Sequence, residues 1–208
     1  VSIFMTVLNE GNHLAATLES IFNQEYEGPI ELAVACGPSI DNTRQLLDQF
    51  ASIYPQLTVI DNPTGVTPIG LNLAIKATSH DILARTDGHA VLPKGYIRQA
   101  VETLRRTGAV NVGGIMDAVG STSVEQAIAA AMTSRLGVGG AAFHVGGPEG
   151  PADSVYLGCF QRSALAAIGG YDEEFVRAQD WELNMRLREA GGTIWFTPAM
   201  RVTYRPRD

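Results

Sequence analysis

The chain has 208 residues, of which 45% are hydrophobic and 18% are charged, and its formal net charge is −7. This length and apolar content fit one globular domain with a substantial core. The acidic balance argues against a protein that binds nucleic acid or an anionic membrane through broad basic surfaces. The run R-V-T-Y-R-P-R at 201–207 is the exception, because it holds three arginines in seven residues.

Two cysteines, Cys36 and Cys159, lie far apart without C-x-x-C spacing. This pattern indicates free thiols in a reducing compartment, and it supports neither a disulfide framework nor a zinc site. The sequence shows no signal peptide and no apolar run near eighteen residues. It begins with Val1 and stops after Asp208, so we expect it to be a piece of a longer protein.

In the first half, apolar runs typical of buried strands alternate with segments of helical periodicity. This alternation predicts βαβ units and a mostly parallel sheet, and ligands of such sheets bind at the carboxyl ends of the strands. We expect Thr67 to cap the third helix, with Pro68 in its first turn. The expected strands are 1–8, 30–36, 57–61 and 81–86, and the expected helices begin near residues 12, 41 and 67.

The second half is less regular. Its segment 136–151 contains six glycines and two prolines, which favours a mobile functional loop over scaffold. The expected helices there are 94–107, 123–135, a short one after 160 and one from 179, and the expected strands are 109–115, 154–160, 193–196 and 200–204.

The stretch R-T-D-G-H-A (85–90) follows a strand of buried type. Asp-Gly is a common turn dipeptide, so a purely structural turn is one interpretation. Backbone alternation would, however, point Asp87 and His89 to the same side. A carboxylate and an imidazole placed in this way can hold a divalent cation beside a diphosphate.

A second group of polar residues lies in Q-D-W-E-L-N-M-R-L-R (179–188). Asp180 and Asn184 are four residues apart and share one face of the expected helix, whereas Glu182 points elsewhere. An acidic residue in a first helical turn often only complements the helix dipole. Asp180 could instead project into a cleft as a general base, and the local sequence leaves both interpretations open.

These segments together resemble a known family. S-I-F-M-T-V-L-N-E, N-P-T-G-V-T-P-I-G-L-N, R-T-D-G-H-A and Q-D-W-E-L-N-M-R-L-R are similar, in this order, to motifs of the family 2 inverting glycosyltransferases with the GT-A fold. G-V-G-G-A-x-F-H, Y-L-G-C-F and Y-R-P-R add a likeness to bacterial exopolysaccharide enzymes of the succinoglycan type. The resemblance implies one GT-A domain over 1–208, with a mostly parallel sheet flanked by helices. Its nucleotide-binding half would reach about residue 115, and its acceptor and catalytic-base half would start at about 116.

The resemblance also implies roles for particular residues. Asp87 falls on the first aspartate of the family's D-x-D motif, and His89 replaces the last one with a softer, titratable metal ligand. The implied cofactor is a divalent cation, Mn²⁺ or Mg²⁺. Asp180 falls on the aspartate of the E-D motif, the catalytic base, and Gln179 replaces the glutamate.

The donor implied by the resemblance is a nucleotide-diphosphate sugar, with a UDP-sugar favoured. Ala35 and Cys36 stand where the family usually carries an aspartate pair, one member of which normally contacts the base, so the resemblance leaves the base of the donor nucleotide open. The residues assigned to the nucleotide-sugar site are Thr6, Leu8, Glu10, Cys36, Asp87 and Gly88.

The implied acceptor is a glycan or a lipid-linked glycan, and the reaction would belong to exopolysaccharide or cell-envelope glycan synthesis. Loop placement makes His144 and Tyr156 candidates to touch it, and Trp181 is a candidate because it adjoins the base. Trp181 is otherwise expected in the core. The expected location is the cytoplasm or, with a membrane segment beyond Asp208, the inner face of the plasma membrane.

Two other classes stay open. A nucleotidyltransferase shares this type of sheet, but it should carry a glycine-rich phosphate loop after the first strand, where this chain has L-N-E-G-N. A non-catalytic nucleotide-sugar or glycan-binding module is favoured by the departures at residues 35–36, 89 and 179, although the presence of Asp180 argues against it. A nicotinamide dehydrogenase is disfavoured because no G-x-G-x-x-G follows the first strand.

Overall fold

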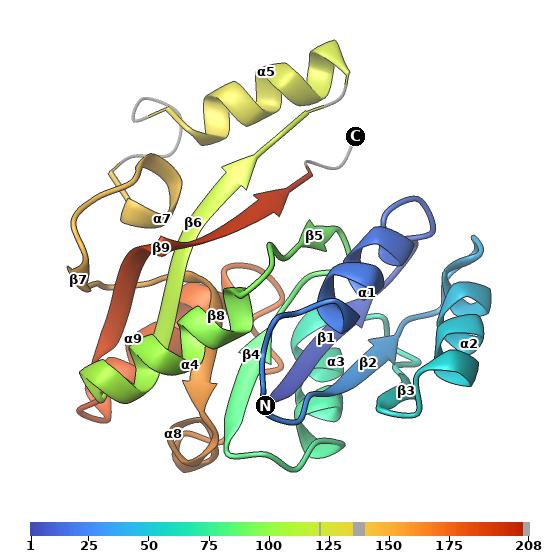
Figure 1. Cartoon of the computed structure of the whole chain (residues 1–208), viewed down its shortest axis with the longest axis horizontal. Coiled ribbons are helices and arrows are strands. Elements are labelled where there is room, and N and C mark those ends of the chain that lie inside the picture. The colour runs from blue at the N-terminus through green and yellow to red at the C-terminus, as the bar shows by residue number, and fades with distance from the viewer. Residues whose placement is uncertain (121, 135–139, 206–208) are drawn as a thin grey trace.

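The computed structural model describes residues 1–120, 122–134 and 140–205. Within them, nine strands form one sheet in the order β3-β2-β1-β4-β8-β6-β9-β5, and β7 pairs with β9 (Figure 1). The strands are β1 (Ser2–Val7), β2 (Glu31–Cys36), β3 (Leu57–Asp61), β4 (Ile82–Arg85), β5 (Ala90–Val91), β6 (Asn111–Ala118), β7 (Gly150–Pro151), β8 (Tyr156–Gln161) and β9 (Ile194–Tyr204). The helices are α1 (Leu14–Phe22), α2 (Thr43–Ile53), α3 (Thr67–Lys76), α4 (Tyr96–Thr107), α5 (Ser123–Met132), α7 (Ala142–Val145), α8 (Arg162–Ala167) and α9 (Gln179–Glu189).

The first half of the sheet is parallel, as the alternation of strands and helices predicts. β1 pairs in parallel with β2 and β4, and β2 pairs in parallel with β3. Their residues are almost all buried in β1, β2 and β4, which explains the continuous apolar runs. The carboxyl ends of β1, β2 and β4 therefore lie along one edge of the sheet.

The second half makes the sheet mixed. β8 is antiparallel to both β4 and β6, β6 is parallel to β9, and β5 and β7 are antiparallel to β9. The predicted α/β class with a central sheet flanked by helices is confirmed, and its parallel strands are concentrated in the N-terminal half. The sequence prediction of two strands at 193–196 and 200–204 is wrong, because β9 is one strand whose register with β6 shifts between Gly113 and Ile115.

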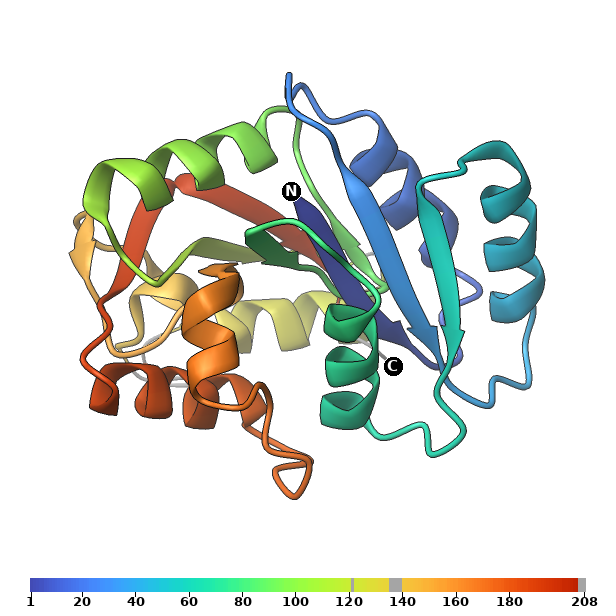
Figure 2. The ribbon, with the colours of Figure 1, turned by 90° about the horizontal axis from the view of Figure 1, so that it is seen from below.

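Helices cover both faces of the sheet. In Figure 2, α1, α2 and α4 lie over one face, and α3, α8 and α9 lie over the other. Each face buries its own apolar cluster: the first includes Leu18 of α1 and Leu104 of α4, and the second includes Leu71 of α3 and Leu183 of α9. The sheet between them is therefore shielded from water on both faces, so polar side chains reach the solvent at the ends of its strands.

Several local expectations need adjustment. Val66 is the residue before α3, and Thr67 is already helical, so Thr67 is not the cap. Residues 136–139 of the glycine-rich segment lie outside the described residues. The rest of that segment includes the one-turn helix α7 and the short strand β7. The role of 136–151 as a mobile loop stays a prediction.

The cysteines and the length of the helices bear on expectations for the chain as a whole. Both cysteines are free thiols, and both are buried. In the part of the chain that the structure describes, no helix is both long and apolar enough to cross a bilayer. The description as a single domain divided near residue 115 stays a prediction.

A hydrogen-bonded cluster closes the edge of the sheet opposite to the carboxyl ends of β1 and β4. Glu31 Oε1 accepts hydrogen bonds from Ser2 Oγ at 2.6 Å and from the backbone nitrogens of Ser79 at 2.6 Å and His80 at 3.2 Å. Burial alone would raise the pKa of Glu31, but these hydrogen bonds outweigh it and lower the pKa to about 2. The cluster joins the starts of β1, β2 and β4 through one ionised carboxylate.

We expect Glu31→Gln to lower the free energy of unfolding by about 1–2 kcal/mol at pH 7, since hydrogen bonds to a charged group are lost at a partly exposed site. The folded pKa lies below the unfolded value, so the contribution of Glu31 is complete above about pH 4.5 and disappears as the pH falls towards 2. Urea unfolding at pH 7 and pH 3 should show the difference between the two proteins shrinking. A constant difference would contradict this role.

Candidate active site

Arg85, the last residue of β4, joins carboxylates from two distant parts of the chain. Its side chain is only 5% exposed. Nη2 lies 3.1 Å from Oδ1 of Asp87, and Nη1 contacts Oδ1 of Asp180. Burial by itself would lower the pKa of Arg85, but the charge of Asp87 helps to raise it, so the guanidinium stays charged. The strand end thus brings Asp87 and Asp180 to one place.

Asp87 is held from two sides. Arg85 engages Oδ1, and the Tyr156 hydroxyl donates to Oδ2 at 3.2 Å. Burial alone would raise the pKa of Asp87, yet the charge of Arg85 prevails and the pKa is lowered. The carboxylate is therefore ionised at neutral pH, and 22% of its side chain stays exposed.

The shape of β8 directs Tyr156 towards Asp87. Leu157 has φ 46, a left-handed conformation that is unusual for a leucine, and the β6–β8 register shifts between Val112 and Gly114. An extra residue of this kind bends a strand and changes the direction of a side chain. Backbone strain of this sort often occurs at functional sites, where it fixes a required geometry.

His89 is paired with a second carboxylate. Its Nδ1 lies 3.0 Å from Oε1 of Glu10, and both side chains are buried. The Tyr204 ring meets the imidazole edge-on at 5.0 Å and the Tyr156 ring edge-on at 6.0 Å. The Tyr156–Tyr204 pair thus connects the surroundings of Asp87 with those of His89.

The Glu10–His89 pair bears on metal binding. In metal-binding histidines, one ring nitrogen commonly pairs with a carboxylate while the other nitrogen binds the metal. Asp87 adds a hard oxygen ligand. Among the described residues no three His, Cys, Asp or Glu side chains gather into a metal site. Asp87 and His89 are the two residues whose chemistry suits a divalent cation, which would take its other ligands from a bound diphosphate.

Asp180 is the second residue of α9 and lines a cavity of about 640 Å³. Its side chain is 30% exposed, and the adjoining Trp181 is 54% exposed. Tyr156 lines the same cavity, and its hydroxyl holds Asp87. Arg85 contacts Oδ1 of this carboxylate, and the Asp180 side chain borders the cavity.

The other polar residues of α9 are structural. Glu182 is buried and pairs with Arg186, whose Nη2 lies 2.7 Å from Oε2. Asn184 accepts a hydrogen bond from Asn111 Nδ2 at 2.7 Å and donates to Ser154 Oγ at 3.0 Å. Both therefore anchor α9, and Asp180 is the acidic residue of the helix that faces the cavity.

The residues expected to line a nucleoside pocket gather at the ends of β1 and β2. Thr6 pairs with Ala35 across the strands and donates from Oγ1 to its carbonyl at 3.0 Å. Leu8 is exposed beyond the end of β1. Cys36 is buried in the core, and burial raises the pKa of its thiol. Of these three side chains, Leu8 is the most open to a ligand.

Gly88 is needed for close packing. A Cβ at this position would lie 2.8 Å from Cγ1 of Val7 and 2.9 Å from Cγ of Glu10. Its carbonyl accepts a hydrogen bond from Thr17 Oγ1 of α1 at 2.9 Å. The turn between Asp87 and His89 is thus fixed by a helix from the first crossover.

The three candidate acceptor contacts are placed differently. Tyr156 and Trp181 line the cavity with Asp180, together with Phe143 of α7. His144, the next residue, is not among the residues described as lining it. Burial lowers the pKa of His144, so its imidazole is neutral at pH 7.

Sequence reasoning missed Arg85 and the partnership of Glu10 with His89. One signal was available for Arg85, because a charged residue that ends a buried strand must find a charged partner. The partner itself, Asp180, lies 95 residues further along the chain. No local pattern reveals such a contact.

Residues 2–168 match the family described as glycosyl transferase family 2. With the fold described above, this match defines the class: the chain has the GT-A fold of glycosyltransferases. It belongs to glycosyltransferase family 2.

Two relatives are similar over nearly the whole chain. One is the succinoglycan biosynthesis protein ExoA of Rhizobium meliloti, 32% identical, with 99% of this chain and 63% of the relative covered. The other, from Methanococcus voltae, is dolichyl N-acetyl-alpha-D-glucosaminyl phosphate 3-beta-D-2,3-diacetamido-2,3-dideoxy-beta-D-glucuronosyltransferase. It is 23% identical, and the match covers 100% of this chain and 67% of the relative. The chain thus spans about two thirds of the length of these relatives.

Solved structures share the fold. The mannosyltransferase PcManGT from Pyrobaculum calidifontis, in complex with GDP-Man and Mn²⁺, superimposes with a TM-score of 0.76 at 19% identity. The match covers 99% of this chain and 57% of that one. S. aureus TarS 1–349 in complex with UDP-GlcNAc gives a TM-score of 0.73 at 17% identity. The match covers 100% of this chain and 58% of the TarS chain.

We expect Arg85→Lys to lower the free energy of unfolding by about 2–4 kcal/mol, because one ammonium cannot replace a forked guanidinium between two partly buried carboxylates. Arg44→Lys is the control, since Arg44 contacts Asp48 and Asp61 on the surface and should change stability by less than about 1 kcal/mol. Urea unfolding of both variants makes the comparison. Equal effects would show that Arg85 is not a structural link.

Proposed function

We propose that the chain is the catalytic region of an inverting glycosyltransferase that moves a sugar from a nucleotide-diphosphate donor to an acceptor hydroxyl. The observation that carries the proposal is the convergence of Asp87 and Asp180 on the buried Arg85. Asp87 lies at the strand end where a diphosphate would bind, and Asp180 lies beside a cavity that can take an acceptor. Donor and acceptor would therefore meet at one point.

The chain's own residues account for the proton transfer. Asp180 Oδ2 takes the proton of the acceptor hydroxyl while that oxygen attacks the anomeric carbon. The new carbon–oxygen bond forms as the bond to the donor's phosphate oxygen breaks, and the electron pair leaves with the nucleoside diphosphate. Attack from the face opposite to the leaving group inverts the anomeric configuration in one step. Arg85 keeps the base oriented, and the cavity walls exclude water that would compete with the acceptor.

Asp87 and His89 are the residues that would hold a divalent cation. Glu10 orients the imidazole, and Arg85 and Tyr156 orient the carboxylate. When bound, such a cation supplies positive charge that stabilises the departing diphosphate. Mn²⁺ accompanies the donor in the PcManGT complex, which supports Mn²⁺ or Mg²⁺ here.

The donor is proposed by class. GDP-Man and UDP-GlcNAc, bound in the two solved structures, are both nucleotide-diphosphate sugars with different bases. We retain a UDP-sugar as the expected donor, with Thr6 and Leu8 at the nucleoside end. Thermal shift with a panel of nucleoside diphosphates and Mn²⁺ tests this choice, since ligand binding raises the melting temperature.

The acceptor is proposed to be a glycan or lipid-linked glycan in exopolysaccharide or cell-envelope synthesis, because one relative is named for succinoglycan biosynthesis. Trp181 offers an exposed aromatic face beside the base on which a sugar ring can stack. The proposed location is the cytoplasm or the inner face of the plasma membrane. A non-catalytic binding module is the alternative that the experiments below separate.

We expect Asp180→Asn to reduce the turnover number by about two to four orders of magnitude, because the amide keeps the shape but cannot accept the proton. Affinity for the nucleotide sugar should stay within about threefold, since the base acts on the acceptor. Donor affinity by calorimetry and sugar transfer by product analysis measure the two effects. Unchanged transfer would remove Asp180 as the base, and no transfer by the wild-type protein with any acceptor would favour a binding module.

Asp87→Asn and His89→Ala should act on the donor instead. Both should weaken nucleoside diphosphate binding, and the remaining binding should no longer depend on Mn²⁺. Titration with and without a chelator provides the measurement. Equal binding by the wild-type protein in excess chelator would show that the Asp87–His89 turn has no metal role.

A further inference from the structure

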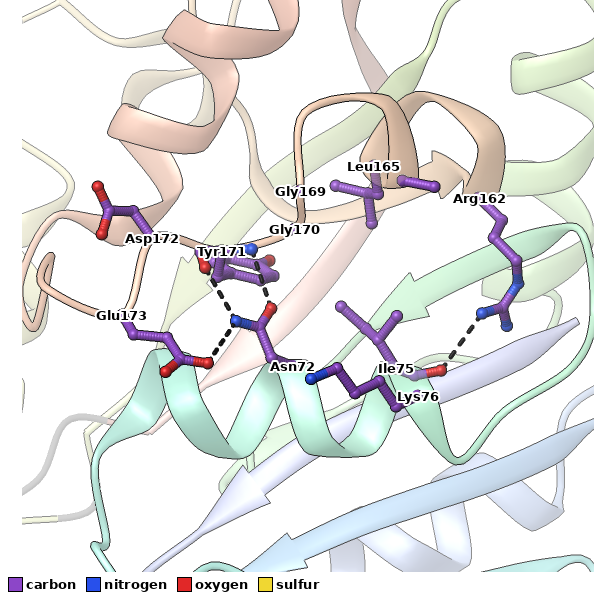
Figure 3. A pocket seen from close by; sticks show the side chains of 11 residues that line it. Asn72, Ile75, Lys76, Arg162, Leu165, Gly169, Gly170, Tyr171, Asp172 and Glu173 are labelled. Atoms are coloured by element: carbon purple, nitrogen blue, oxygen red, sulfur yellow. Dashed lines mark hydrogen bonds between the residues drawn. The ribbon is translucent and has the colours of Figure 1, made fainter.

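The side chain of Asn72 holds the backbone of Tyr171 at both of its polar groups. Tyr171 N donates to Asn72 Oδ1 at 2.9 Å, and Asn72 Nδ2 donates to the Tyr171 carbonyl at 2.9 Å (Figure 3). Nδ2 also donates to Oε1 of Glu173 at 3.1 Å. A primary amide that pairs with both groups of one residue imitates the pairing of a neighbouring strand, so α3 is fixed to the segment that leads into α9.

This contact demands a glycine beside it. Gly170 has φ +80, and a Cβ there would lie 2.8 Å from Asn72 Oδ1. Gly169 also has φ +80, but a Cβ there would meet nothing within 4 Å. The two neighbours therefore carry the same backbone requirement, and only Gly170 carries the packing requirement.

Tyr171 connects this contact to the active site. Its ring is buried, and the Arg85 guanidinium carbon lies 5.9 Å from the ring centroid, within the range of a cation–π interaction. Burial raises the pKa of Tyr171 to about 12, so the ring is neutral at physiological pH. Arg85 in turn contacts Asp87 and Asp180. A continuous series of contacts thus runs from Asn72 to the proposed base.

We propose that Asn72 is a positioning residue for glycosyl transfer, which fixes Tyr171 beneath Arg85 and thereby sets the place of Asp180. The inference rests on the proposed function of Asp180. Asn72 lies in the segment N-P-T-G-V-T-P-I-G-L-N, which marks the family but contains no group assigned to the chemistry. The hydrogen bonds between Asn72 and Tyr171 give this part of the motif a structural role.

The adjacent glycines provide a matched pair of variants. Gly170→Ala should lower kcat by about tenfold or more, because displacing reacting groups by a fraction of an ångström is costly. Gly169→Ala should keep kcat within about twofold, although it carries the same backbone strain at φ +80 as Gly170→Ala and should also lose thermal stability. The donor KM should stay within about twofold in both. Equal kcat for the two variants would overturn the proposal.

Asn72→Ala should reproduce the loss of kcat seen in Gly170→Ala. Glu31→Gln is the stability control, because it weakens the fold at the opposite edge of the sheet. At a temperature where Asn72→Ala and Glu31→Gln are both folded, Glu31→Gln should keep the wild-type kcat. A parallel loss of kcat in Glu31→Gln would mean that stability alone governs the rate, and the inference would fail.

A fluorescence measurement tests the positioning without any substrate. The chain has two tryptophans, so Trp195→Phe leaves Trp181, next to Asp180, as the single reporter. In this background, Asn72→Ala and Gly170→Ala should change the acrylamide quenching of Trp181, whereas Gly169→Ala should not. Identical quenching in all variants would show that the contact does not reach α9.

Combination with Asp180→Asn separates this inference from the proposed function. If Asn72 acts through the base, Asn72→Ala should cost little further transfer rate in the Asp180→Asn protein. Full additivity would reject the inference while leaving the base assignment intact. If Asp180→Asn itself retains wild-type transfer, the proposed role of Asp180 as the base fails first, and the Trp181 quenching still reports whether Asn72 positions α9.

Discussion

The structure depends on one buried positive charge. Arg85 is the buried last residue of β4, and at this depth an unpaired guanidinium would cost several kcal/mol. Its pairing with Asp87 and Asp180 offsets that cost, but only if the turn after β4 and the start of α9 both approach the same strand end. The position of α9 relative to the sheet is therefore tied to the satisfaction of a charge.

The same constraint organises the proposed chemistry. A carboxylate that serves as a base must be held within a fraction of an ångström of its substrate, and Arg85 provides that restraint from below. Tyr156 restrains Asp87 from the side through a strained turn at Leu157, and Glu10 restrains His89. The proposed base and the proposed metal ligands are thus each fixed by a partner from another element, as expected of a preorganised site.

The two halves of the sheet were unequally accessible to sequence reasoning. In the parallel half, continuous apolar runs and amphipathic helices alternate, and the pattern predicts both the elements and their order. In the second half, β6, β8 and β9 contain register shifts, and their pairing directions are set by contacts across the sheet. β9 is one long strand, but Thr197 and Pro198 break its apolar pattern, so the sequence predicts two strands there.

For the site, the sequence by itself determined which residue types were present and near which strand or helix ends. The stretch R-T-D-G-H-A after an apolar run, and Asp180 in the first turn of a helix, are local patterns. Only the tertiary structure decided the partnerships: Arg85 with Asp180, Glu10 with His89, and Asn72 with Tyr171, which are 95, 79 and 99 residues apart. Periodicity records how a segment meets the core, whereas a contact between two particular side chains depends on strand order and register, which arise only when the whole chain packs.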